Sequence, residues 1–144
     1  MKVPTALSVL LTAVAIIAFA AGALALAGMR VARVVDGDSV RLNLGVLARI
    51  EGIDAPERGH RARCPQEAAL AEAASTRLEQ IAAAPGAYVI WTWHLEKFGR
   101  PMVRVMLDGR DAGAMLVSEG LARAYGGGKR AGWCPAPGMA DARR

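Results

Sequence analysis

Apolar residues near the beginning of the chain follow a strand pattern. From Met29 to Ile53 they are mostly β-branched residues or leucine, and Val40, Leu42 and Leu44 alternate with polar residues. A period of two is typical of a strand that buries one face. The pattern therefore predicts three antiparallel strands separated by two glycine turns, with strands at residues 29–35, 39–44 and 46–53 and turns at 36–37 and 44–45.

The next segment changes to a helical period. Between Cys64 and about Ala83, apolar positions recur every three or four residues and so share one helix face: Leu70, Ala74, Leu78 and Ile81. Residues 87–94 and 101–107 again have the composition of strands, and a short helix is expected over 112–119, ending at Gly120. The fold class predicted is α+β, a five-stranded OB-type β-barrel with two to three helices, which commonly binds nucleic acid on one face.

The first 27 residues differ from the rest and predict an N-terminal hydrophobic helix. Val3 to Met29 carries no charge, and such a run can cross a hydrocarbon core of roughly 30 Å. The small residues Ala25 and Ala27 before Gly28 favour a cleaved signal peptide, whereas the length of the run and the single Lys2 favour a retained membrane anchor. Under both interpretations the domain is exported: it is secreted, periplasmic or anchored to the membrane from outside the cytoplasm. We expect the domain over 28–134 and a tail over 135–144.

Charge and cysteines add two expectations. The formal net charge of +5 becomes +4 without residues 1–27, since that segment carries one basic and no acidic residue. A basic exported domain suits a polyanionic partner, although the same charge also serves ordinary solubility. Cys64 and Cys134, the two cysteines of the chain, predict one disulfide in an oxidising compartment, which would fasten the segment at Trp133 to the start of the first long helix. We expect a monomer.

Two acidic clusters flank an arginine, and together they suggest phosphodiester chemistry. Asp36 and Asp38 precede Arg49, and Asp54 and Glu57 follow it. Carboxylate oxygens bind hard cations such as Ca²⁺ or Mg²⁺, and a bound cation can polarise a phosphate. Each cluster alone is equally compatible with an ordinary turn or loop, so the hypothesis depends on both clusters and the arginine occurring together.

Four motifs resemble the staphylococcal nuclease (thermonuclease) family, in the same order and over about residues 29 to 134. They are VVDGDSV at 34–40, RIEGIDAPE at 49–57, FGR at 98–100 and LVSEGLA at 116–122. The resemblance implies a calcium-dependent endo- and exonuclease that acts on DNA and RNA, folds as an OB barrel with helices and leaves 3′-phosphorylated products. Mg²⁺ or another divalent cation is an alternative to Ca²⁺.

The resemblance also implies a role for each matched residue. Asp38, Asp54 and the backbone carbonyl of Ala55 would hold the cation, with Asp36 in an outer position. Glu57 would act as general base or position the attacking water. Arg49 and Arg100 would hold the scissile phosphate, where guanidinium groups offer charge-assisted hydrogen bonds.

Other residues remain open. Phe98 stands where the family usually has tyrosine, so a phenol contact from that position is lost. Tyr125 is a candidate for nucleotide binding, with core or rim packing as the alternative. The cationic residues 58–63, which include His60, suit either a nucleic-acid backbone or a solvated loop. Trp91, Trp93 and His94 are expected in core or edge packing, and the alternative for the tryptophans, with Trp133, is a stacking surface.

Three classes of protein are therefore considered. The first is an exported nuclease, and the second is a non-catalytic nucleic-acid-binding OB module. The third is a membrane-tethered domain that binds a protein or polysaccharide and uses the acidic pair as a structural calcium site. Because all six charged residues of the family set are present, the nuclease is preferred.

Overall fold

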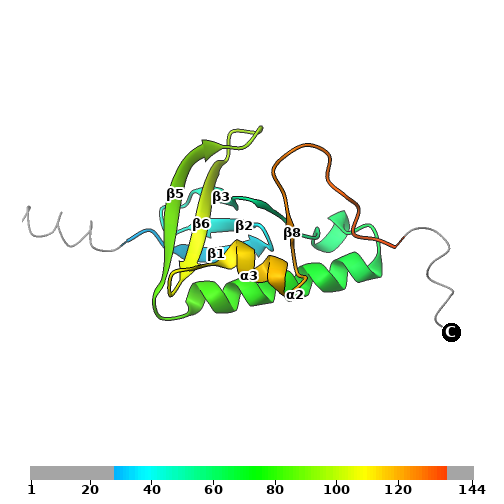
Figure 1. Cartoon of the computed structure of the whole chain (residues 1–144), viewed down its shortest axis with the longest axis horizontal. Helices are drawn as coiled ribbons and strands as arrows, with labels where there is room; N and C mark the ends of the chain where they lie inside the picture. The colour runs from blue at the N-terminus through cyan, green and yellow to red at the C-terminus, as the bar shows by residue number, and fades with distance from the viewer. Residues whose placement is uncertain (1–27, 136–144) are drawn as a thin grey trace, which may run out of the picture.

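The computed structural model of the protein describes residues 28–135, and its main sheet is curled into a half-barrel (Figure 1). The strand order is β1-β2-β3-β6-β5, with β7 beside β6. β3 and β6 run parallel, whereas the other pairs are antiparallel. The strands are β1 (Val31–Asp36), β2 (Ser39–Leu42), β3 (Leu47–Ile50), β5 (Ala87–Leu95), β6 (Pro101–Leu107) and β7 (Arg110–Asp111). The predicted OB-type α+β fold is confirmed.

The predicted strand at 46–53 is divided into two. β3 ends at Ile50 and β4 (Ile53–Asp54) begins after a turn in which Gly52 has a φ of 81°. β4 then leaves the main sheet and pairs with β8 (Arg123–Ala124). The break turns the chain so that Asp54 lies between the main sheet and the C-terminal segment.

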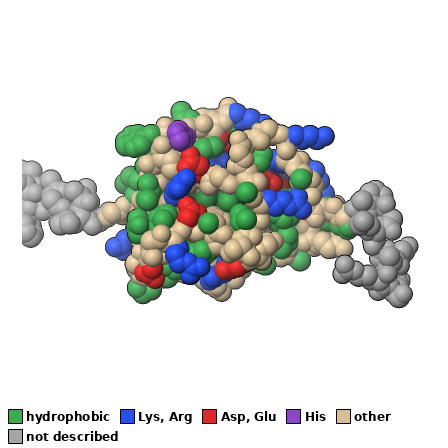
Figure 2. Space-filling view, in the orientation of Figure 1, with side chains coloured by type: hydrophobic (Ala, Val, Ile, Leu, Met, Phe, Trp, Pro, Cys, Tyr) green, Lys and Arg blue, Asp and Glu red, His purple; other side chains and the backbone are tan. Residues whose placement is uncertain are grey.

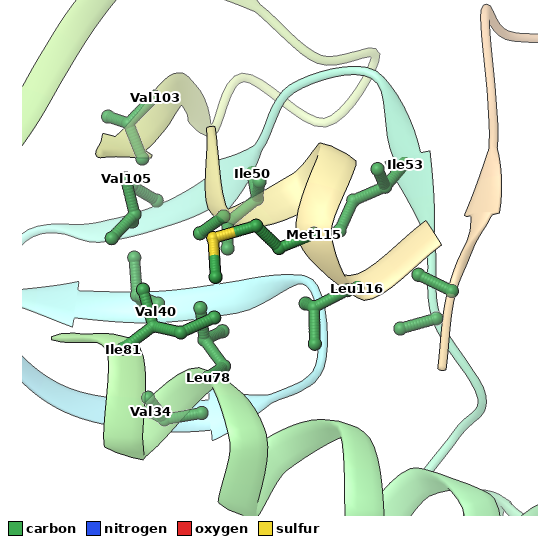
Figure 3. Packing of buried hydrophobic residues seen from close by; sticks show 14 of the residues in the cluster. Val34, Val40, Ile50, Ile53, Leu78, Ile81, Val103, Val105, Met115 and Leu116 are labelled. Carbon is green, nitrogen blue, oxygen red and sulfur yellow. The ribbon is translucent and has the colours of Figure 1, made fainter. Parts of the chain in front are cut away.

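Helix α2 (Pro65–Ala83) lies along β1 and closes one side of the core (Figures 1 and 3). Its N-cap is Cys64, and its proline at the first position needs no hydrogen-bond acceptor. The buried stripe contains Ala71 where Leu70 was predicted, since Leu70 is only half-buried. Leu78 and Ile81 meet Val34 and Val40 from the sheet in Figure 3. Each fully buried aliphatic side chain of this size stabilises the fold by about 1.5–3 kcal/mol.

The second helix, α3 (Ala112–Ser118), packs against β6 and ends close to the predicted position. Asp111 caps it, because its carboxylate accepts a hydrogen bond from the backbone N–H of Ala114 at 3.0 Å. The last backbone groups of the helix are satisfied by a turn at Gly120, whose φ is 73°. Leu116 of this helix is fully buried in the core (Figure 3).

The β5–β6 hairpin extends beyond the rest of the sheet (Figure 1). Its register shifts between Trp91 and Leu95, and Trp93 adopts a φ of 63° within the shift. The irregularity turns Trp93 outward, and its exposed fraction is 85%. Of the two expected arrangements, core packing is therefore wrong, and the residue lies on β5, an edge strand of the sheet. His94 is also exposed, where its Nδ1 lies 2.6 Å from Glu51 Oε1.

The segment over 1–27, predicted as a signal peptide or membrane anchor, lies outside the described residues, as do residues 136–144 of the predicted tail. Between residues 28 and 135, no helix has both the length and the hydropathy needed to cross a membrane.

Candidate metal and phosphate site

The two acidic clusters meet because the β1–β2 turn packs tightly against its neighbours. A Cβ atom at Gly37 would lie only 2.8 Å from the Cβ atoms of both Ala55 and Ala74. Only glycine therefore allows the turn that carries Asp36 and Asp38 to approach both α2 and the segment that follows Asp54. The sequence predicted this meeting of clusters, and the glycine contact provides its physical cause.

Asp38 and Arg49 form a buried bidentate pair at the centre of the site. Arg49 Nη1 lies 2.9 Å from Asp38 Oδ1, and Nη2 lies 2.8 Å from Oδ2. The Ser39 hydroxyl and the backbone N–H of Ala55 donate to the same carboxylate at 3.0 and 3.1 Å. Loss of hydration by burial nevertheless raises the pKa of Asp38 to about 6, although Arg49 opposes this shift; nearby Asp36 adds to it.

Asp54 has a buried carboxylate oxygen that is not used as a hydrogen-bond acceptor within residues 28–135. Its Oδ1 atom is buried and accepts no hydrogen bond from any described residue. Arg130 Nε is 3.1 Å away and Arg49 Nη2 is 3.7 Å away, so both are in ion-pair contact, but neither contact is a hydrogen bond. Oδ2 accepts a hydrogen bond from the indole Nε1–H of Trp133 at 3.3 Å.

Glu57 lies at the solvent side of the cluster between two arginines. Arg61 Nε is 3.2 Å from Glu57 Oε2, and Arg61 Nη2 is 3.2 Å from Asp36 Oδ2. Arg130 Nη1 is 3.4 Å from Glu57 Oε1. The predicted general base is thus linked by Arg61 to the first acidic cluster and by Arg130 to Asp54.

The cationic segment at 58–63 faces carboxylates in this structure. It contains a short 3₁₀ helix, η1 (Gly59–Arg61). Arg58 pairs with Glu72 at 2.7 Å and donates to the carbonyl of Val35, while Arg61 contacts the acidic cluster. The prediction that this segment contacts a nucleic-acid backbone stays untested.

Arg100 is held outside the acidic cluster by Glu96. Arg100 Nε donates to Glu96 Oε1 at 2.6 Å, and this hydrogen bond raises the pKa of Arg100 and lowers that of Glu96. The negative charges of Asp38 and Asp36 raise the pKa of Arg100 further. The guanidinium of Arg100 therefore interacts electrostatically with the cluster, while its direct hydrogen-bond partner is Glu96.

A cleft of about 710 Å³ opens beside the site, between the β5–β6 hairpin and the segment after β8. Arg49 and Arg130 lie on its wall, together with Phe98 and Tyr125. The Tyr125 hydroxyl donates to the carbonyl of Gly128 at 2.7 Å, so the phenol is fixed by the local backbone. With Lys97 also on its wall, the cleft thus combines three cations with two aromatic rings, one of which belongs to the predicted Tyr125.

The predicted disulfide is present and ends the segment after β8. Cys64 and Cys134 are bonded to each other, and so their sulfur atoms are not thiolate ligands for a metal. Glu67 lies beside them, buried, and its ligand atom is within 4.8 Å of both sulfurs. This group is a structural cluster that connects the disulfide to the first turn of α2.

The charges of the cluster nearly cancel. Four carboxylates are matched by three guanidinium groups, which leaves one net negative charge: Asp36, Asp38, Asp54 and Glu57 against Arg49, Arg61 and Arg130. Elsewhere on the molecule, acidic and basic side chains are also interspersed, as Figure 2 shows for one face. The net positive charge of the chain is therefore not concentrated on that face.

The donor set fits a hard divalent cation. Such ions prefer carboxylate oxygens, and Asp54 Oδ1 is a buried carboxylate oxygen that accepts no hydrogen bond from the described residues. Asp38 provides oxygens only when its bidentate contact with Arg49 opens. Ala55 is buried next to both aspartates, with its N–H directed to Asp38.

For five residues, the sequence did not predict the contact with this site that the structure shows. Two of them had a signal, because Arg61 follows Glu57 by four positions and Glu96 precedes Arg100 by four. Glu67 lies in the first turn of the predicted helix, only ten residues after Glu57. Arg130 and Trp133 contact Asp54 from far along the chain, and the only indication of their position was the predicted disulfide at Cys134.

The fold and the site define an OB-type α+β protein with a centre of buried carboxylates and arginines. The model of the family described as staphylococcal nuclease homologue matches residues 48–131. The chain therefore belongs to this family, as its motifs predicted. The match begins after Asp36 and Asp38, so the first acidic cluster lies outside it. No curated protein matches the chain.

Proposed function

We propose that the protein is an exported, metal-dependent nuclease that hydrolyses phosphodiester bonds of DNA and RNA. The observation that carries the proposal is Asp54 Oδ1, a buried carboxylate oxygen without a hydrogen bond from the described residues, beside Asp38 and Arg49. A buried carboxylate oxygen that accepts no hydrogen bond is costly even beside arginines, and a bound cation would lower that cost. Family membership supports nucleic acid as the substrate class.

Asp38, Asp54 and the carbonyl of Ala55 would hold Ca²⁺, or Mg²⁺ or another divalent ion, with Asp36 behind them. When bound, the cation supplies Lewis-acid polarisation of the phosphate. Because Asp38 is engaged by Arg49, cation binding requires this pair to open. Its opening frees the Arg49 guanidinium for the substrate.

Glu57 takes the proton of the attacking water in this proposal. Its carboxylate lies at the more exposed side of the cluster, with 29% of its side chain accessible, so water and substrate can approach it. Arg49 and Arg100 donate charge-assisted hydrogen bonds to the phosphate oxygens, which strengthen as negative charge accumulates there. Tyr125 in the adjoining cleft contacts the nucleotide.

Export is part of the proposal. The disulfide between Cys64 and Cys134 supports it, because such bonds persist in oxidising compartments. Cell fractionation of the producing organism tests this part: we expect the protein outside the cytoplasm, with no free thiol. Recovery from the cytoplasm with two free thiols would contradict export.

One observation favours a non-catalytic OB module as the second candidate. Both oxygens of Asp38 are already engaged by Arg49, Ser39 and Ala55, as in a purely structural ion pair. The two candidates differ in a cleavage assay with single-stranded DNA and RNA in Ca²⁺, in Mg²⁺ and in chelator. The nuclease cleaves only with a divalent ion, whereas binding without cleavage under every condition would replace it with the binding module.

A further inference from the structure

Residues 126–134 form a strap that crosses the acidic cluster. In Figure 1 this segment arches away from β8 and returns to the N-terminal end of α2. It starts after Tyr125, whose backbone N–H donates to the carbonyl of Gly52 at 2.8 Å. It ends at Cys134, which is bonded to Cys64 at the N-cap of α2. The strap is therefore fixed at both ends.

Trp133, next to the C-terminal end of the strap, connects the strap to Asp54. Its indole N–H donates to Asp54 Oδ2, and the guanidinium of Arg123 lies 3.9 Å from the centre of its ring. Arg123 Nη1 also donates to the carbonyl of Gly132 at 2.9 Å. A cation–π contact and two hydrogen bonds thus hold the strap against β4 and β8.

The strap brings Arg130 to the site, where its guanidinium faces two proposed functional carboxylates. Nε is 3.1 Å from Asp54 Oδ1, and Nη1 is 3.4 Å from Glu57 Oε1. About 37% of the Arg130 side chain is exposed, and it lines the same cleft as Arg49. Arg130 therefore neutralises the cluster from the side on which a substrate would enter.

The ion pair between Arg130 and Asp54 can be broken more easily than the bidentate arginine–carboxylate contact of the site. It is an ion pair without an aligned hydrogen bond, in contrast to the bidentate contact between Arg49 and Asp38. A divalent cation at Asp54 would take over the neutralisation and repel the guanidinium. Arg130 also lines the cleft, so an anion bound there could become its partner, and guanidinium groups bind phosphate in a planar, two-pronged geometry.

We propose that Arg130 is a third substrate-binding arginine, which neutralises Asp54 and Glu57 in the cation-free protein and binds a nucleic-acid phosphate when a divalent cation occupies Asp54. The disulfide-fixed strap determines its position. The inference rests on the proposed nuclease function and adds to it a residue that lies outside the four sequence motifs.

Calcium titration without nucleic acid tests the first half, by calorimetry on the full chain. Arg130→Ala should bind Ca²⁺ about two- to fivefold more tightly than the wild type, since a competing, partly exposed ion pair is removed. The matched control is Arg33→Ala, which also removes one positive charge; Arg33 is exposed on β1 and forms no ion pair with another residue between 28 and 135. Equal Ca²⁺ affinity in Arg130→Ala and Arg33→Ala would overturn the inference.

Binding of a phosphorothioate oligothymidylate in Ca²⁺ tests the second half. Arg130→Ala should bind about tenfold more weakly, and its plot of log affinity against log salt should lose about one unit of slope, as expected for one lost phosphate contact. Arg33→Ala should keep the wild-type slope, and Arg130→Lys should restore most of it. An unchanged slope in Arg130→Ala overturns the inference, whereas a wild type that binds no oligonucleotide contradicts the proposed function itself.

Removal of the disulfide by substitution of both cysteines gives an independent test of the strap. Cys64→Ser with Cys134→Ser should lower the salt slope of an otherwise wild-type chain toward that of Arg130→Ala. The same two substitutions should change nothing further in the Arg130→Ala background, because the contact is already absent. Equal losses in both backgrounds would show that the strap does not act through Arg130, and would overturn that part of the inference.

Discussion

The buried carboxylate of Glu67 is hydrogen-bonded to the backbone N–H of Glu57, ten residues earlier in the chain. Glu67 Oε1 accepts the Glu57 N–H at 3.4 Å, and Oε2 accepts the N–H of Arg63 at 2.7 Å. Glu67 is only 3% exposed and belongs to the first turn of α2, where negative charge is also favourable. One side chain thus fixes both ends of the segment that leads away from the proposed general base.

Glu67→Ala should therefore affect both stability and turnover. Two backbone N–H groups lose their acceptor, at a cost of about 1–3 kcal/mol in the free energy of unfolding. Turnover should fall more than substrate affinity, because Glu57 is displaced while the arginines remain. Glu79→Ala, an exposed glutamate on the same helix, provides the control. Denaturant unfolding and steady-state kinetics measure both effects, and wild-type behaviour in Glu67→Ala would contradict the role.

Gly37→Ala should disrupt the meeting of the two acidic clusters. The new Cβ atom would lie 2.8 Å from two alanine side chains, so the turn must move. Overpacking of this kind costs about 1–3 kcal/mol, and the movement should also weaken Ca²⁺ binding. Gly28→Ala is the control, because no atom lies within 4 Å of a Cβ atom there. Thermal unfolding and calcium titration of the two variants should differ; equal results would mean that the turn has room to relax.

Much of the fold follows from local pattern. The alternation at Val40 and Leu42, the period of α2 and the glycine turns each specify an element from neighbouring residues. The parallel pairing of β3 with β6 and the division of β3 from β4 were not predicted, because they depend on the tertiary path and on one positive φ at Gly52. The exposure of Trp93 likewise arises from a strand irregularity that alternation does not reveal.

The contacts of the site likewise divide into those that the sequence predicted and those that depend on the tertiary path of the chain. Asp36, Asp38, Arg49, Asp54 and Glu57 were predicted to converge, and they do so within a segment short enough for sequence spacing to be informative. Arg130 and Trp133 contact Asp54, although more than seventy residues separate them from it in the sequence. No periodicity encodes such a contact; only the cysteine pair indicated that this part of the chain returns to α2.

Arg100 should depend on Glu96 for its position. Arg100→Ala should lower turnover by about 10², as expected for the loss of one contact to a charged transition state. Glu96→Gln should give a smaller decrease with an unchanged fold, since the amide still accepts a hydrogen bond but no longer attracts the guanidinium electrostatically. Arg110→Ala, an exposed arginine on β7, should remain active. Kinetics of the three variants test this order, and a larger effect of Glu96→Gln than of Arg100→Ala would contradict it.

Glu57→Gln should abolish most of the activity without unfolding the protein. The substitution keeps the shape of the side chain but removes its capacity to accept a proton, and the expected loss of turnover is at least about 10². Glu79→Gln makes the same chemical change at an exposed position of α2. Turnover near that of the wild type would exclude Glu57 as the base. Circular dichroism should be identical for both variants, which separates a chemical effect from a structural one.

The stability of the cation-free protein should depend on pH through Asp38. The pKa of this carboxyl rises from its ordinary value of 3.8 to about 6 in the folded chain, chiefly because it is buried. Between these values the folded state binds more protons than the unfolded state, so the contribution to the free energy of unfolding decreases as pH rises. It is fully present below pH 3.8 and lost as pH passes about 6, with a total on the order of 3 kcal/mol.

Denaturant unfolding of the wild type and of Asp38→Asn, in chelator from pH 3.5 to 7, isolates this effect. Other carboxyls, among them Glu51 and Glu96 with lowered pKa values, change stability in the opposite direction but do so in both proteins. The difference in unfolding free energy, wild type minus variant, should therefore decrease toward pH 7. Asp108→Asn, in the exposed turn after β6, should follow the wild type. Parallel curves for the wild type and Asp38→Asn would show that Arg49 compensates the burial of Asp38 completely.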